Sequence, residues 1–498
     1  MRIHRLFLLQ VAGTAVQAFH AVTASRVAPP HHQADPRQLQ ALRPPTTIKQ
    51  VASTQSWTEV PHTGDESTLT MVATREEQLV VEPEDDSKLM NVAMFNLIKC
   101  ALGSGVLALP SGIAAMSDLK STILPSALFL TVLGTVSAYT FYNVGRVCQQ
   151  TGSKSMGEAW ERQVGKDSKW IVSFATASLT FGCCLAYSIV VGDTFHSLAT
   201  TTNLPLSRSA AHMLVTLGAM FPLCMLNNLA SLAPVSVVGV IGTFLTVVFM
   251  GWRCMGPGYK AGGRLFATLA PALKPSFGIR GQGKALSSLV LVSMSALAFL
   301  IHFTAADFVN TFPKGEKQLK SFKTLTVKGF SWTVGLSVAV LAFGYLTFGG
   351  NAAGNILNNY ASADVGATIC RLLMGISVVG SFPFCLASCR AAVLDLMGRG
   401  GSTAATPRTN RMVSAGLLAL VTSFALRLKD AGIVVAINGA LMGSALNYIF
   451  PAVMLLKSGK TARWERNLNR SLIVIGVVMA MAGGTVSCLN AFAPHLLR

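Results

Sequence analysis

The sequence predicts an all-α membrane protein with about eleven transmembrane helices. Of its 498 residues, 51% are hydrophobic and only 12% are charged, a balance on the membrane side of ordinary globular usage. Long stretches without Asp, Glu, Lys or Arg follow one another, and about 20 apolar residues are enough to cross a bilayer. These stretches are residues 100–117, 121–145, 170–192, 209–252, 285–306, 329–363, 372–389, 412–426, 431–456 and 471–497.

Two of these stretches decide the helix count. Residues 209–252 are long enough for two spans, and Asn227-Asn228 supplies a polar turn between them. Residues 412–426 form the shortest stretch, so Arg411 and Arg427 at its ends would have to extend toward the membrane surfaces. With the long stretch counted twice, the total is about eleven spans.

The basic residues indicate how the helices are oriented. The net charge is +19, but one set of alternate loops holds 19 Lys and Arg whereas the opposite set holds 11. By the positive-inside rule, the N-terminus lies inside and the C-terminus outside. The long loop from Arg253 to Lys284 departs from the rule, although long loops weigh less. The charge therefore reflects membrane topology, and no nucleic acid partner is expected.

The first ninety residues differ from the rest in composition. Residues 1–58 carry six Lys or Arg against a single acid, Asp35, and residues 59–90 form an acidic linker. A cleaved secretory signal would invert the loop bias, so a plastid or mitochondrial transit peptide fits residues 1–58 better. A disordered tail is the alternative, and the protein would then belong in the plasma or vacuolar membrane. Residues 91–492 form the transmembrane domain.

The first apolar stretch is opened by an unusual motif, residues 96–110 (NLIKCALGSGVLALP). A helix that only anchors a protein needs neither the lysine nor the break at Gly103, Ser104 and Gly105. A broken helix exposes backbone groups, which is tolerable at membrane depth only beside a cavity or a ligand. The unwound N–H groups can bind a carboxylate, aided by the following half-helix. The alternative is a small-residue packing face, but glycines two apart do not share a helix face.

At this motif the chain resembles the amino acid/auxin permease family, and the likeness covers about residues 88–492. The resemblance implies five-plus-five inverted repeats with a LeuT-like architecture and one extra helix, in which the broken first and sixth helices hold the substrate. The matching segments are residues 186–193 (AYSIVVGD), 222–232 (PLCMLNNLASL), 299–302 (FLIH), 344–349 (GYLTFG), 381–383 (SFP) with Arg390, and 447–451 (NYIFP).

The resemblance also implies a coupling site around Lys99, Asn96 and Ser381. In sodium-coupled relatives the Lys99 position resembles an asparagine of the cation site, whereas in proton-coupled relatives it is a lysine. Ser381 matches a hydroxyl ligand position. An ammonium would repel sodium and could replace its charge, and a buried lysine can titrate. The alternative is a lysine that extends to the inner membrane surface.

The sixth span departs from the family pattern because residues 286–312 contain no Gly or Pro to force unwinding. Phe299, His302 and Phe303 would then have to form the pocket from their side chains. Tyr187 of the third span is expected to face either this pocket or an outer gate. The alternative for His302 is a hydrogen-bonded packing histidine.

These observations predict a secondary active transporter that moves neutral amino acids by alternating access, independently of sodium and with coupling to protons. The alternative is an amino acid sensor of the same fold that signals to a protein partner. An enzyme is not expected, because no nucleophile–base pair or paired carboxylates occur in the spans. The ten cysteines form no metal-ligand pattern, so neither a metal nor a cofactor is expected. The sequence fixes neither the substrate nor the oligomeric state.

Overall fold

The computed structural model describes residues 86–226, 233–278, 285–398, 405–459 and 461–493. The predicted leader, nearly all of the acidic linker and the Asn227-Asn228 turn lie outside these residues. The described residues form helices and connections, with a single isolated β-bridge between Ser276 and Gly349. The predicted all-α membrane fold is therefore confirmed.

Nine helices of the described chain are long and apolar enough to cross a membrane, and a bent pair adds a tenth. The unbroken spans are α4 (Ile123–Thr151), α6 (Lys169–Thr201), α9 (Ala233–Met255), α13 (Glu316–Phe348), α14 (Val365–Leu396) and α16 (Pro407–Arg427).

The remaining spans are interrupted or contain wider, π-helical turns. Helix 1 consists of α2 (Asp86–Ala101), η1 (Ser104–Ala108) and α3 (Leu109–Met116), and helix 6 of α11 (Ser288–Ala298), η8 (His302–Thr304) and α12 (Ala305–Asn310). The last two spans contain π-helical turns. They are α17 (Ala431–Asn438), η10 (Gly439–Gly443), η11 (Ala445–Ile449) and α18 (Phe450–Lys457), followed by α19 (Arg463–Val478), η12 (Met479–Gly483) and α20 (Gly484–Phe492).

The expected fourth span is shorter than the others. It consists of α7 (Arg208–Val215), η4 (Thr216–Met220) and α8 (Phe221–Cys224), and it leads into residues outside the described chain. It is not one of the nine or ten membrane-length helices, which is why that count falls below the expected eleven. Short helices connect the spans: α5 (Met156–Gln163), α10 (Arg264–Ala267) and η9 (Ile356–Asn359).

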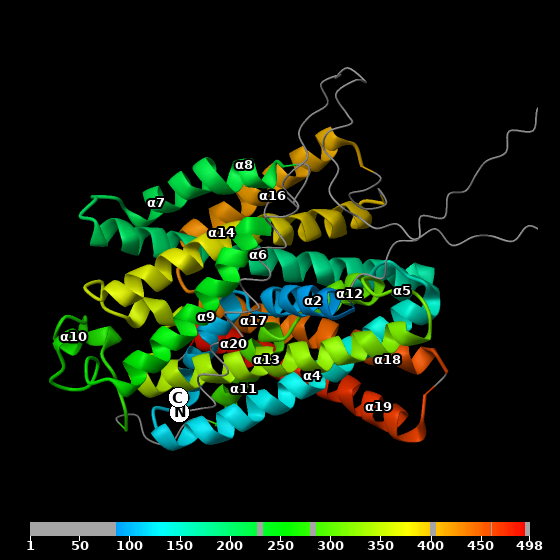
Figure 1. Ribbon diagram of the computed structural model, residues 1–498, viewed down its shortest axis with the longest axis horizontal. Helices are drawn as coiled ribbons and strands as arrows, with labels where there is room; N and C mark the ends of the chain where they lie inside the picture. Colours follow the sequence, from blue (N-terminus) through cyan, green and yellow to red (C-terminus); the bar gives the residue numbers. More distant parts are fainter. Residues whose placement is uncertain (1–85, 227–232, 279–284, 399–404, 460, 494–498) are drawn as a thin grey trace, which may run out of the picture.

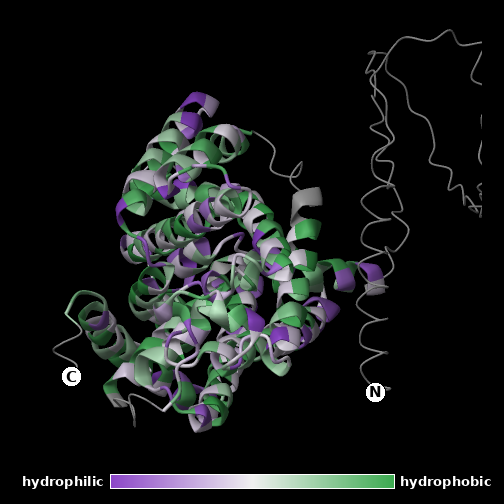
Figure 2. Cartoon of the chain, turned by 90° about the vertical axis from the view of Figure 1, so that its left-hand side faces the viewer, coloured by the Kyte–Doolittle hydropathy of each residue, from purple (hydrophilic) through white to green (hydrophobic). Residues whose placement is uncertain are grey.

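The long helices run roughly in one direction, which is horizontal in Figure 1. α14 packs against α6 and α9, α13 packs against α4, and α11 packs against α3 and α17. Green, hydrophobic residues extend along most of the helices in Figure 2. Large apolar side chains such as Leu124 and Trp170 are 76% and 60% exposed. Such exposure is favourable against lipid, where apolar surface carries no hydration cost.

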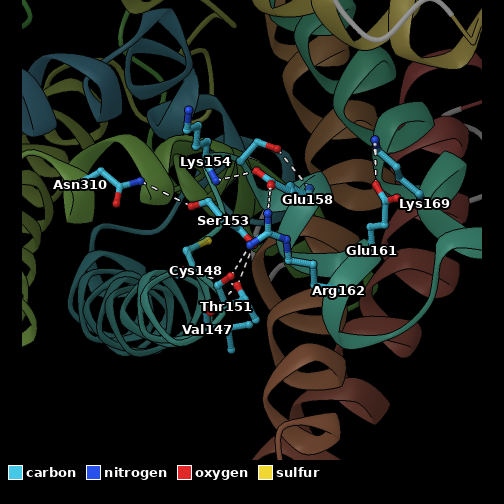
Figure 3. A network of polar contacts seen from close by, with 11 residues as sticks. Val147, Cys148, Thr151, Ser153, Lys154, Glu158, Glu161, Arg162, Lys169 and Asn310 are labelled. Carbon is cyan, nitrogen blue, oxygen red and sulfur yellow. Dashed lines mark hydrogen bonds and ion pairs between the residues drawn. The ribbon is translucent and has the colours of Figure 1, made fainter. Parts of the chain in front are cut away.

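A polar network joins neighbouring ends of α4, α5 and α12 (Figure 3). Arg162 of α5 donates to the carbonyl of Thr151 at the end of α4 and to the carboxylate of Glu158. Asn310, the last residue of α12, donates to the carbonyl of Ser153 at 3.5 Å. Backbone groups freed at these helix ends are thereby satisfied.

A second polar cluster, around buried Asp364, joins the connection that follows α9 to the start of α14. Its carboxylate caps α14 at Gly366 N (3.1 Å) and accepts from Arg253 at 2.6 Å and from the Tyr259 hydroxyl at 2.9 Å. Burial raises the pKa of Tyr259, so the phenol stays protonated and can donate. The basic loop that departs from the positive-inside rule is thus anchored to the start of α14.

Candidate functional site

A small cavity lies where the break of helix 1 faces α6, α9 and α14. Its volume is about 20 Å³, which admits a water molecule but is too small for an amino acid. The site is therefore contracted in this conformation, and a substrate would require the surrounding helices to separate. The cavity is lined by Lys99, Leu102, Gly103, Tyr187, Gly239, Val240, Thr243, Met374, Ser377, Val378 and Ser381.

The predicted break in helix 1 is present at Leu102 and Gly103. The two halves of the helix meet at an angle of 46°. Gly103 has an extended backbone (φ −78°, ψ −173°), and its N–H donates to the Ala101 carbonyl at 3.0 Å. Ser104 and Gly105 begin η1, where the first N–H groups of a helix have no partner within it. These N–H groups are suited to an anionic ligand.

Tyr187 of α6 covers the unwound turn from the opposite side. A Cβ added at Gly103 would lie 2.7 Å from the Tyr187 hydroxyl oxygen, whereas one at Gly105 would meet only Val435 at 4.0 Å. Any larger residue at position 103 would therefore displace the Tyr187 hydroxyl from this turn.

We expect Gly103→Ala to lower the uptake rate at least about ten-fold, because it displaces Tyr187 from the unwound turn. Uptake into proteoliposomes at equal protein density measures the effect. Adding Tyr187→Phe should restore part of the rate, since the hydroxyl oxygen makes the closest contact and the nearest ring carbon lies at 3.6 Å. Gly416→Ala on α16 is the matched control, because no atom lies within 4 Å of its added Cβ. Equal losses in both glycine variants would contradict this assignment.

Lys99 and Ser381, predicted to form the coupling site, line the same cavity from α2 and α14. Lys99 lies in the last turn of α2, and its Nζ is 5.0 Å from the centroid of the Phe384 ring. The C-terminal end of a half-helix favours a positive charge. Asn96 lies one turn earlier, is exposed, and does not line the cavity.

Helix 6 is broken at residues 299–301 although it contains neither Gly nor Pro there. The Leu300 N–H donates to Leu297 at 3.1 Å, which is a tighter turn than an α-helix makes. The carbonyl of Ala296, left free by this change, accepts from the Asn447 side chain of η11 at 2.6 Å. The break is therefore stabilised by a polar side chain from another helix rather than by the local sequence.

The side chains predicted from helix 6 do not line the cavity. His302 is fully buried and its Nε2 lies 2.9 Å from the Thr140 hydroxyl of α4, with its ring edge-on to Phe141. Phe299 is also fully buried and its ring lies beside Gly134 of α4. Phe303 is half-buried against the core. The geometry places His302 and Phe299 in packing against α4.

Seven lining residues were not predicted: Leu102, Gly239, Val240, Thr243, Met374, Ser377 and Val378. A Cβ at Gly239 would lie 2.5 Å from the Ser377 hydroxyl oxygen, so α9 and α14 approach closely here. The Thr243 hydroxyl donates to the Gly239 carbonyl at 3.0 Å. Ser377 lies four residues before Ser381, a spacing that places both on one helix face, and this signal could have identified it. No group of three metal-ligating side chains is found in the described chain.

The two broken helices pack against one another, and the break of helix 1 faces a cavity; this arrangement is typical of membrane transporters built from discontinuous helices. Residues 89–489 match the family model described as transmembrane amino acid transporter protein, and the chain belongs to this family. The resemblance stated above is thereby confirmed. The chain is a multi-pass amino acid transporter and not an enzyme.

The names of two relatives differ in what they state, because one names a vacuolar transporter without a coupling ion and the other names sodium coupling. The chain is 23% identical to vacuolar amino acid transporter 2 of Saccharomyces cerevisiae, over 83% of this chain and 86% of the relative. It is also 23% identical to sodium-coupled neutral amino acid transporter 7 of Danio rerio, over 79% and 84%. Family membership alone therefore leaves the coupling ion open.

Solved structures support the LeuT-like fold. The manganese transporter of Eremococcus coleocola, bound to an aromatic bis-isothiourea compound, aligns with a TM-score of 0.53 at 11% identity. A histidine-to-alanine mutant of the same transporter gives 0.52 at 13% identity. Each alignment covers 82% of this chain and 88% of the other. At this identity the likeness concerns the fold alone.

Proposed function

We propose that this protein is a sodium-independent, proton-coupled transporter of neutral amino acids that works by alternating access. The observation that carries the proposal is that Lys99 lines the same cavity as Ser381, at the C-terminal end of the broken half-helix α2. In this position a fixed ammonium would occupy the place of a coupling cation and repel sodium.

The cavity also supports a preference for neutral substrates. Among the described lining residues, Lys99 is the single charged side chain, and the others are apolar or carry hydroxyl groups. The substrate carboxylate would bind the unwound N–H groups at Ser104 and Gly105. No acidic lining residue is then available for a cationic side chain of a substrate. Selection among neutral amino acids would depend on the space between Tyr187, Thr243 and Met374.

The membrane in which the protein works is part of the same proposal. The chain is an integral multi-pass protein, and one of its relatives is named as vacuolar. The basic residues 1–58 would direct it to an organelle. An acidic compartment on the outer side would supply the proton gradient that replaces sodium.

Uptake of radiolabelled amino acids into proteoliposomes tests the proposal directly. We expect uptake to rise at least about ten-fold when the outer side is made acidic by about one pH unit or more, and to be unchanged when choline replaces sodium. A protonophore is the matched control and should abolish the rise. Sodium-driven uptake would overturn the proposed coupling, and specific binding without any uptake would favour a sensor.

A further inference from the structure

A buried histidine lies in the first turns of α7 and does not line the cavity. His212 of α7 is fully buried, and its Nε2 is 2.8 Å from the hydroxyl oxygen of Ser188 on α6, which is also fully buried. Its Nδ1 is buried and has no hydrogen-bond partner within the described chain. A neutral imidazole that donates from Nε2 therefore keeps a buried lone pair on Nδ1 that is able to accept a proton.

One turn before His212, Arg208 takes part in an ion pair that joins three elements. Its Nε donates to Oδ1 of Asp193 on α6 at 2.6 Å, and the Asn358 side chain of η9 donates to Oδ2 of the same carboxylate at 3.0 Å. The side chains of Asp193 and Arg208 are 14% and 16% exposed. We call these three residues, Asp193, Arg208 and Asn358, the outer latch.

The latch holds the loop that covers the outer side of helix 1. η9 contacts η1, and Ile356 of η9 lies near Pro110 across Gly344. Next to it, Gly354 packs so closely on the start of α17 that a Cβ there would lie 2.1 Å from the Asp430 carboxylate. Opening the cavity to the outer side requires this loop to move, and the contact between Asn358 and Asp193 must then break.

His212 lies close to the latch. A Cβ at Gly192 of α6 would be 3.5 Å from both Cγ of His212 and Cζ of Arg208, so these two atoms are within about 7 Å of each other. A proton on His212 would place a second positive charge beside Arg208. It would repel the guanidinium and compete for the Asp193 carboxylate, which weakens the latch.

We propose that His212 is a proton-binding site that opens the outer latch when the outer side is acidic. This role rests on the proposed proton coupling and identifies His212 as the group that binds the proton. With neutral His212 the latch is closed, as in this structure. In the open state Arg208 is released and His212 meets water. The open state therefore binds the proton more tightly than the closed state. Because binding and conformation are linked, acid shifts the population toward the open state.

The other charged groups near His212 do not duplicate this role. On α6, Asp193 belongs to the latch, and the Nδ1 of His196 lies 2.9 Å from the Leu206 carbonyl in the connection between α6 and α7. On α7, Arg208 belongs to the latch. From α16, the Ala425 carbonyl accepts from Arg208 at 3.3 Å, and Arg427 is exposed. η4 carries no charged residue. Among the described residues, His212 is therefore the buried histidine that lies close enough to Arg208 to weaken the latch when it is protonated.

Distance measurements between two spin labels test the proposal without substrate. Thr201 and Ser362 are both exposed, at the end of α6 and in the loop after η9, and each is replaced by cysteine. Cys100 and Cys488, the two exposed native cysteines of the described chain, become serine. The labelled full-length protein is measured in lipid nanodiscs at about pH 7.5 and about pH 5.5, a range in which histidine titrates.

We expect acid to increase the long-distance population at least about three-fold in the protein with native His212. His212→Gln should remain in the short-distance state at both pH values, whereas the matched control His196→Gln should respond like the parent. Arg208→Gln should show the long distance at both pH values. An unchanged acid response in His212→Gln, no response in the parent, or a closed Arg208→Gln would overturn the proposal. Sodium-driven uptake would refute only the proposed coupling, because these distances are measured without transport.

Discussion

Replacement of Lys99 by asparagine is expected to reduce uptake driven by a pH gradient at least about ten-fold, a loss that corresponds to about 1.4 kcal/mol. The ammonium lies at the C-terminal end of α2 and lines the cavity together with Ser381. A neutral amide cannot carry the charge that the half-helix end favours, and it offers an oxygen to a cation instead. We therefore also expect sodium to stimulate the residual uptake of the variant.

The measurement is uptake in proteoliposomes under separate pH and sodium gradients. Lys88→Asn is the matched control, because Lys88 lies on the same helix but is exposed and does not line the cavity; it should behave like the native protein. Lys99→Arg keeps the charge and should retain more activity than Lys99→Asn. If Lys99→Asn kept the native response to pH, Lys99 would be an interfacial lysine rather than part of the coupling site.

The two broken helices show what the sequence can and cannot reveal about the fold. In helix 1 the signal is local: Gly103 in the unwound turn leaves room for Tyr187, and Pro110 fits the start of α3. In helix 6 no such residue exists, and the break depends on a hydrogen bond between Asn447 and Ala296. These residues are far apart in the chain, so the family resemblance, rather than any local pattern, was the guide to this break.

The candidate site also contains two kinds of residues: those that sequence motifs identify and those that only the tertiary structure reveals. Lys99, Gly103, Tyr187 and Ser381 were singled out from motifs, and all four line the cavity. The contribution of α9 could not be predicted, because its lining residues have no distinctive local pattern and reach the cavity through packing on α14. His212 belongs to the same category: its role depends on Ser188 and Arg208, and only the tertiary structure shows how the three are arranged.

The largest loss of stability is expected from Gly439→Val. Gly439 begins a π-helical turn after α17, and a Cβ there would lie 2.0 Å from the backbone carbonyl oxygen of Ser293 on α11. The obstacle is backbone, so no side-chain rotation relieves the clash and the two helices must separate. Close approach of small residues is a main source of helix association in membranes, where apolar burial gives no net gain. We expect a loss of about 3 kcal/mol or more.

Thermal unfolding of the detergent-solubilised protein, followed by size-exclusion chromatography, measures this loss as a fall in Tm. Gly416→Val on α16 is the matched control, because no atom lies within 4 Å of its added Cβ; it should change Tm little. Because α11 ends at the break of helix 6, even Gly439→Ala should lower uptake as well as Tm. If Gly439→Val were as stable as Gly416→Val, α11 and α17 would not depend on this contact, and the position of the helix 6 break would have to be maintained by Asn447 alone.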